Sequence, residues 1–213
     1  MTALLLSITA LIAYTMGMLR TDIIASRFIF HRDLRSYSRD NFGITNFLNE
    51  YGWGGMVIVI GAEMLKTIVP VIIGSLLLSI IGEAQVGRAF AYFCVMMGTT
   101  FPVLYRFKGE HSLVAMITGL ILIRFPLGLF TLLAIAAIYY FTHYVSLAVV
   151  GSSVITLVVS FMLLDSVWTQ RLILAAAVTV LIEYRKSIVR LIRKKEPKFY
   201  FRRDLSYIFN DQI

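Results

Sequence analysis

The segment from Asp33 to Asn46, which reads DLRSYSRDNFGITN, is rich in groups that bind anions. Its arginines carry planar guanidinium groups that match phosphate oxygens, and its amide and hydroxyl side chains are neutral donors. Gly43 lets backbone N–H groups approach such oxygens closely. The composition favours a site for a phosphorylated ligand, with Asn41, Gly43, Thr45 and Asn46 as donors. Taken alone, the segment could equally be a hydrated loop in which Asp and Asn form turns and helix caps.

Two further polar features interrupt apolar surroundings. Glu63 and Lys66 lie one helical turn apart within an apolar run, so they would share a helix face and could form an ion pair. Residues 101–111 read FPVLYRFKGEH and follow another apolar run. Ionisable groups at membrane depth usually face a protein interior or a watery cavity, and are hypotheses for a functional site. A neutralised structural pair is the alternative for Glu63 and Lys66.

The composition predicts an all-α integral membrane protein. Of the 213 residues, 59% are hydrophobic and 15% are charged, whereas about 45 to 50% apolar residues is usual in soluble domains. Because a membrane-spanning helix needs about 20 apolar residues, we expect about seven transmembrane helices. The apolar stretches are residues 2–19, 56–81, 87–105, 112–123, 126–142, 146–164 and 168–184. The fourth is short, and we expect a half-helix packed on protein or a tight turn.

The basic residues predict the orientation, because Lys and Arg concentrate in cytoplasmic loops. With the N-terminus outside and the C-terminus cytoplasmic, sixteen Lys and Arg residues lie inside and three outside. The chain would be a single membrane domain, 1–213, whose basic cytoplasmic tail, 184–213, contacts anionic lipids by snorkelling. Nucleic-acid binding is not expected, since these charges adjoin the membrane and no recognition fold remains to present them.

Common catalytic motifs are missing from the sequence. It contains no Rossmann or P-loop glycine pattern, no H-E-x-x-H and no serine nucleophile elbow. Its carboxylates and histidines do not cluster at metal-ligand spacings, so we expect neither a metal nor another cofactor. The polar segments themselves are therefore the candidates for function.

Several segments, in order, resemble blocks of the bacterial acyl-phosphate:glycerol-3-phosphate acyltransferases, small membrane enzymes that make lysophosphatidic acid. The family block D-I-R-x-x-G-S-G-N-x-G-A-T-N is similar to residues 33–46, and D-x-L-K-G-x-x-P-V to residues 63–71. G-H-x-F-P-V-x-x-x-F-K-G-G-K-G is similar to residues 98–112. THYVSL at 142–147 and the EPK that ends at Lys198 resemble two later blocks, so the resemblance covers about residues 17–198.

The chain also departs from these blocks. Ser38-Arg39-Asp40 stands where the family has G-S-G, which replaces flexible backbone donors by charged side chains. Thr99 replaces a histidine in the third block, and Tyr184 and Ser187 replace the histidine and asparagine of the last block. A tyrosine hydroxyl, with an ordinary pKa of about 10, is a poor general base near neutral pH.

The resemblance implies transfer of an acyl group from an acyl phosphate to glycerol 3-phosphate, or to a related polar acceptor, in a multi-pass protein of the bacterial plasma membrane. It implies Arg35 and Lys108 as catalytic residues, and His111 is the nearby candidate for a replacement base. The implied substrate-binding residues are Arg27, Asn41, Gly43, Thr45, Asn46, Glu63, Lys66, Gly109 and Arg185. An ordinary interfacial histidine is the alternative for His111.

Two other functions remain open. The altered blocks favour a catalytically inactive relative that binds lipid or serves as a subunit of a membrane complex. A small transporter or channel is the third hypothesis, against which the gathering of polar groups on one side argues.

Overall fold

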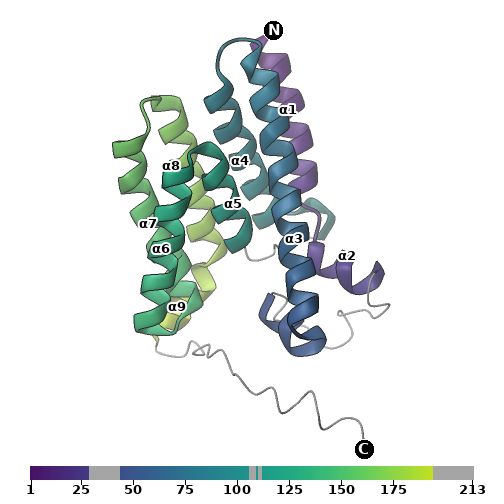
Figure 1. Cartoon of the computed structure of the whole chain (residues 1–213), viewed down its shortest axis with the longest axis vertical. Coiled ribbons are helices and arrows are strands. Elements are labelled where there is room, and N and C mark those ends of the chain that lie inside the picture. Colours follow the sequence, from purple (N-terminus) through teal and green to yellow (C-terminus); the bar gives the residue numbers. More distant parts are fainter. Residues whose placement is uncertain (29–43, 106–108, 110–111, 194–213) are drawn as a thin grey trace, which may run out of the picture.

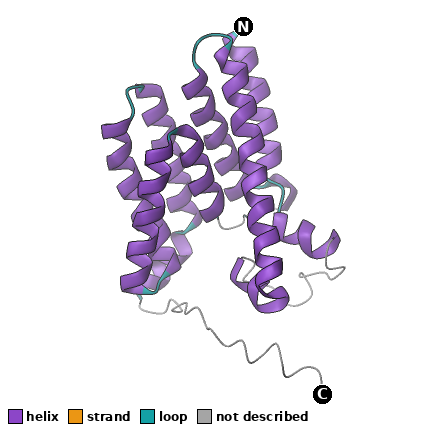
Figure 2. Cartoon of the chain, viewed as in Figure 1, coloured by secondary structure: helices purple, strands orange, loops and turns teal. Residues whose placement is uncertain are grey.

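A computed structural model of the chain describes residues 1–28, 44–105, 109 and 112–193. The described residues form helices joined by short connections, without a strand among them (Figure 2). This confirms the expected all-α class. The elements in chain order are α1 (Thr2–Gly17), α2 (Thr21–Phe28), α3 (Ile44–Ser79), α4 (Ala84–Thr100), the 3-10 helix η2 (Val103–Tyr105), α5 (Leu113–Ile123), α6 (Phe125–Thr142), α7 (Val145–Leu163), α8 (Val167–Glu183) and α9 (Arg185–Ile192).

A helix occupies each of the seven apolar stretches, as α1 and α3 to α8. Three described segments are long and apolar enough to cross a membrane: Gly52–Ser79, Phe125–Thr142 and Val145–Leu163. Their outward faces are apolar, with Phe130, Leu133, Val158 and Met162 among the exposed side chains. Such a continuous apolar surface fits lipid contact, because soluble monomers rarely expose large apolar patches.

Helix α4 is the centre of the bundle and packs against α1, α3, α5 and α8. The helices approach closely where glycines face one another. A Cβ atom added at Gly87 of α4 would lie 2.3 Å from the Gly74 carbonyl oxygen of α3. Small residues at such contacts let helix backbones meet where water exclusion cannot drive association. The N-terminus lies at one end of this bundle, and α2 and α9 lie at the other (Figure 1).

Helix α5 is the half-helix expected for the fourth stretch. It has 11 residues, and seven of them are buried among neighbouring helices. Arg124 separates it from α6, and Pro126 lies in the first turn of α6, so the chain divides where the sequence predicts. Arg88 of α4 donates a hydrogen bond from Nη1 to the Leu122 carbonyl, at 3.2 Å. The protein itself thus stabilises the carbonyl end of this short helix.

Two parts of the segment expected to be a loop are helical instead. The sequence interpretation treated residues 20–55 as a connection, but α2 begins at Thr21 and α3 begins at Ile44. Apolar residues at 44, 47, 48 and 51 have helical spacing, which explains the early start of α3. Gly52, with φ 65° and ψ −168°, then breaks the helix, since essentially only glycine adopts this conformation.

The close approach of α3 and α4 predicts unequal effects of two glycine substitutions. Gly87→Ala should destabilise the protein by about 1–3 kcal/mol, because the added methyl group must displace backbone. Gly61→Ala in α3 is the control: a Cβ there meets nothing within 4 Å, and alanine favours a helix by about 0.5–1 kcal/mol. Equilibrium unfolding in mixed micelles measures both. Equal stability of the two variants would contradict the packing.

Candidate functional site: two carboxylates at one end of the bundle

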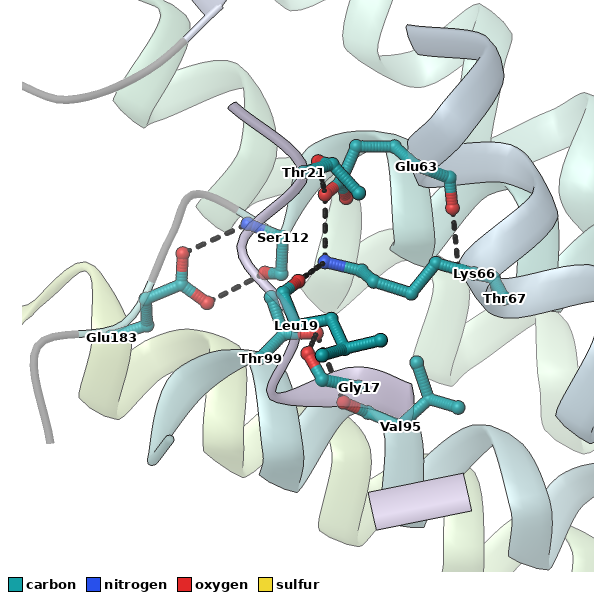
Figure 3. A network of polar contacts seen from close by, with 10 residues as sticks. All are labelled: Gly17, Leu19, Thr21, Glu63, Lys66, Thr67, Val95, Thr99, Ser112 and Glu183. Carbon is teal, nitrogen blue, oxygen red and sulfur yellow. Dashed lines mark hydrogen bonds and ion pairs between the residues drawn. The ribbon is translucent and has the colours of Figure 1, made fainter. Parts of the chain in front are cut away.

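The first carboxylate, Glu63 in α3, forms the ion pair that its spacing from Lys66 predicts. The Lys66 ammonium lies 2.6 Å from Glu63 Oε1, and it also donates to the Leu19 carbonyl oxygen at 3.2 Å. Thr21, the first residue of α2, donates its hydroxyl to the same Glu63 oxygen. The ion pair of α3 therefore holds the start of α2, through Thr21, and the end of the α1 region, through Leu19 (Figure 3).

Both members of this pair are enclosed by protein. Glu63 is 1% exposed and Lys66 is 4% exposed. Removing two charges from water is expensive, and their attraction in a low-dielectric interior offsets that cost only with good geometry. The Oε2 atom of Glu63 is buried and has no hydrogen-bond partner among the described residues. The opposite charges of Glu63 and Lys66 thus cancel within the pair, and Glu63 Oε2 remains available as an acceptor.

A buried cation adjoins this cluster. Arg20, between α1 and α2, is 5% exposed, and its guanidinium lies 5.9 Å from the centre of the Tyr105 ring. A guanidinium over an aromatic face at this distance is a cation–π contact. It connects the end of α1 with η2, the first part of the segment between α4 and α5.

The second carboxylate is Glu183, the last residue of α8. Its Oε1 accepts the Ser112 backbone N–H at 3.0 Å, and its Oε2 accepts the Ser112 hydroxyl at 2.6 Å. Thr100 also donates its hydroxyl to Oε2, at 3.2 Å. Ser112 is fully buried and Thr100 is 5% exposed. Donors from α4 and from the start of α5 therefore converge on one carboxylate.

Polar contacts between α1 and α4 lie between these clusters (Figure 3). The Thr99 hydroxyl donates to the Gly17 carbonyl oxygen at 3.2 Å. The Tyr14 hydroxyl donates to the Phe101 carbonyl oxygen at 2.8 Å. The ends of α1, α4, α5 and α8 thus form one polar region, which the apolar parts of the bundle adjoin.

The predicted site residues fall into four groups. Glu63 and Lys66 are brought together, and Gly109 lies against the end of α4, because a Cβ there would be 2.5 Å from the Thr100 carbonyl oxygen. Arg27 of α2 and Arg185 of α9 are exposed and belong to helices that pack on different neighbours. Thr45 and Asn46 lie in the first turn of α3 rather than in a loop, and their side chains are not described. Arg35, Asn41, Gly43, Lys108 and His111 lie outside the described residues.

Sequence reasoning missed several residues of this region. Arg20 counts there only as one of the basic residues that predict the orientation, and no site role is predicted for Thr21, Thr100, Ser112 or Glu183. A carboxylate next to the end of an apolar stretch, as at Glu183, was an available signal. Its partners could not be read from sequence, because Ser112 is 71 residues away.

Tyr184, between α8 and α9, is not suited to proton abstraction. It is 3% exposed and belongs to the buried apolar core. Burial raises the pKa of its phenol well above the ordinary value, and the negative charge of Glu183 raises that pKa further. The hydroxyl therefore stays protonated at neutral pH, which agrees with the expectation that Tyr184 is a poor base.

Comparison with protein families gives one match that spans most of the chain. The family described as glycerol-3-phosphate acyltransferase matches residues 7–194. A glycerol-3-phosphate acyltransferase of Thermoanaerobacter sp. (strain X514) is 29% identical over 196 residues, which are 90% of this chain and 94% of that protein. One of Bacillus subtilis (strain 168) is 28% identical over 198 residues, 92% of this chain and 98% of that protein.

The fold has similar solved structures. A crystal structure of PlsY (YgiH), an integral membrane glycerol 3-phosphate acyltransferase, in its glycerol 3-phosphate form has a TM-score of 0.76 and 20% identity. The similarity covers 96% of this chain and 98% of that one. The lysophosphatidic acid form of PlsY has a TM-score of 0.77 over 92% of this chain and 95% of that one. This similarity establishes a shared membrane-protein fold over nearly the whole length.

The buried ion pair predicts a large difference between single and double substitution. Lys66→Met leaves the Glu63 carboxylate uncompensated and should cost about 3–5 kcal/mol of unfolding free energy. Glu63→Gln combined with Lys66→Met should cost clearly less, because no unpaired charge remains buried.

Equilibrium unfolding in mixed micelles measures these differences. Arg171→Met is the control, since Arg171 is exposed and its contact with Trp168 is of a kind worth about 0.5–1 kcal/mol. If Lys66→Met were as stable as the control, the pair would not have the structural importance inferred from its burial.

Proposed function

The chain belongs to the glycerol-3-phosphate acyltransferase family, and on this premise we propose that it transfers an acyl group from an acyl phosphate to glycerol 3-phosphate in phospholipid synthesis. The observation that carries the proposal is the family match across residues 7–194, which includes nearly all the polar segments. Related enzymes are matched over 94% and 98% of their own length. The proposal therefore concerns the whole protein and not a shared fragment.

The reaction that we propose needs positioning more than activation. A glycerol hydroxyl oxygen attacks the acyl carbon, the bond from that carbon to the phosphate oxygen breaks, and inorganic phosphate leaves. The hydroxyl proton passes to a base, for which we propose His111. Because acyl phosphate is already activated, the protein mainly holds the hydroxyl near the acyl carbon and stabilises the leaving phosphate with cations.

We assign the cationic role to Arg35 and Lys108, which lie in two of the segments that resemble family blocks. Asn41, Gly43, Thr45, Asn46 and Gly109 would bind the phosphorylated substrate through amide, hydroxyl and backbone donors. Arg27 and Arg185 would add positive charge, and their exposed side chains support an interaction with a water-borne anion.

Glu63 and Lys66 have a different place in this proposal. The Lys66 ammonium is already engaged by Glu63 and by the Leu19 carbonyl. We therefore propose that the pair forms the floor of the substrate cavity and holds Thr21 and the end of α1 in place. The unused Oε2 of Glu63 remains an acceptor that a substrate hydroxyl could approach.

The membrane arrangement is also proposed. Helices α1, α3, α4 and α6 to α8 would cross a bacterial plasma membrane, with α5 as a half-helix between them, in a single multi-pass domain whose N-terminus is outside and whose C-terminus is cytoplasmic. The site would then open to the cytoplasmic side, while the acyl chain stays in the bilayer. The tail from residue 184 would contact anionic lipids, which the exposed Arg185, Lys186 and Ile192 of α9 support.

The proposed chemistry predicts that Lys108→Ala nearly abolishes turnover. The expected loss is about 10²- to 10³-fold in kcat, the usual effect of removing one group that stabilises developing negative charge. Phosphate release by the purified protein in lipid, supplied with long-chain acyl phosphate with and without glycerol 3-phosphate, measures it. The control Arg171→Ala removes an exposed positive charge near the start of α8, at the end of that helix away from Glu183 and the candidate site. It should keep the wild-type rate.

Two results would contradict the proposal. Unchanged release in Lys108→Ala would remove Lys108 from the reaction. The absence of acceptor-dependent release in folded wild-type protein would favour the alternative of an inactive, lipid-binding relative.

A further inference from the structure

We propose that Glu183 is a positioning residue whose carboxylate holds together the two ends of the segment 101–111. The inference rests on the proposed function, because that segment carries Lys108 and Gly109. Helix α4 ends at Thr100, and Ser112 is the N-cap residue of α5. Both residues donate to the carboxylate of Glu183, so one side chain of α8 connects the residue before the segment with the residue after it. We call these hydrogen bonds of Glu183 to Thr100 and Ser112 the clasp.

The donor set explains why a carboxylate is suited to this position. Within the part of the chain that the structure describes, the Ser112 N–H and the Ser112 and Thr100 hydroxyls donate to the two oxygens of Glu183. Only an ionised carboxylate offers acceptors alone. Ser112 makes no side-chain capping bond within α5, because its hydroxyl is directed to Glu183. The negative charge also lies at the positive end of the α5 dipole, which stabilises the arrangement.

A second close contact joins the segment to the end of α4. Gly109 lies against the last turn of α4, and a Cβ there would be 2.5 Å from the Thr100 carbonyl oxygen and 2.6 Å from that of Thr99. The residue before Gly109 is Lys108. The backbone next to the proposed catalytic lysine is therefore fixed against the same residues that Glu183 holds.

The clasp also lies beside the first carboxylate cluster. Figure 3 shows the bonds of Glu183 to Ser112 near the bonds of Lys66 to Glu63 and Leu19, with Thr99 between them. The Tyr14 hydroxyl bond to the Phe101 carbonyl fixes the start of the segment to α1. Loss of the clasp should let the segment shift relative to the proposed cavity floor, and a displacement of about 1 Å can cost about 10²-fold in rate.

The test compares Glu183→Ala, Glu183→Gln and the control Glu83→Ala in the phosphate-release assay. Glu83 is exposed at the other end of the bundle, before α4. Glu183→Ala should lower kcat/KM by about 10- to 100-fold, with a higher KM for the phosphorylated substrates. Glu183→Gln should recover most of that loss, because its oxygen accepts the Ser112 N–H while the hydroxyls rotate to accept from its amide. Glu83→Ala should match the wild type.

Ser112→Ala tests whether Glu183 influences the reaction through its hydrogen bonds to Ser112. If Glu183 acts through Ser112, the double variant Glu183→Ala with Ser112→Ala should lose little more than Glu183→Ala alone. Additive losses would overturn the inference. It would also be overturned if Glu183→Ala lowered kcat only in proportion to the folded fraction with KM unchanged, which is the mark of a purely structural role.

Hydrogen exchange keeps the inference testable even if the proposed function fails. In the full-length protein in lipid, amides of residues 101–112 should exchange at least about tenfold faster in Glu183→Ala than in Glu83→Ala. Equal exchange would overturn the clasp whatever the activity. Faster exchange in Glu183→Ala, together with no acyltransferase activity in the wild-type protein, would support the clasp and reject the proposed function.

Discussion

Carboxylates that pack among the ends of apolar helices take their hydrogen-bond donors from the protein, and this constraint organises the polar end of the bundle. Glu63, which is buried, draws donors from α2 and from its own helix, while Glu183, which is half-buried, draws donors from α4 and from the start of α5. An unpaired charge at the depth of Glu63 would cost several kcal/mol. The ends of helices that are far apart in sequence are therefore held together by two acidic side chains.

The rest of the fold brings both carboxylates to the same end of the bundle (Figure 3). Helix α4 packs against four other helices, and facing glycines let it approach α3 closely. The short α5 begins at the polar end and stops inside the bundle, where Arg88 donates to the Leu122 carbonyl oxygen. A full-length helix is not needed there, because neighbouring helices bury most of α5. The segment between α4 and α5 thus starts and ends within the polar region.

Much of this arrangement could be predicted from the sequence, since long apolar runs and the spacing of ionisable residues are local signals. The seven apolar stretches, the half-helix at α5 and the pairing of Glu63 with Lys66 were predicted in this way, and so was the family. Helix α2, the helical start of α3 and the clasp of Glu183 were not. The clasp joins residues 71 and 83 positions apart, and such contacts depend on tertiary packing that no local pattern encodes. The sequence shows Tyr184 in place of a family histidine, but the burial of Tyr184 could not be predicted from it.

The central claim is that a chain with altered sequence blocks still catalyses the family reaction, because its helical frame positions an activated donor. The most direct measurement is the fate of the acyl group. The purified protein in lipid would receive acyl phosphate with a ¹³C-labelled chain together with glycerol 3-phosphate, and mass spectrometry would follow the label. The account predicts labelled acylglycerol phosphate in large excess over the protein. Label that remains in acyl phosphate, or appears only as free fatty acid, would contradict it.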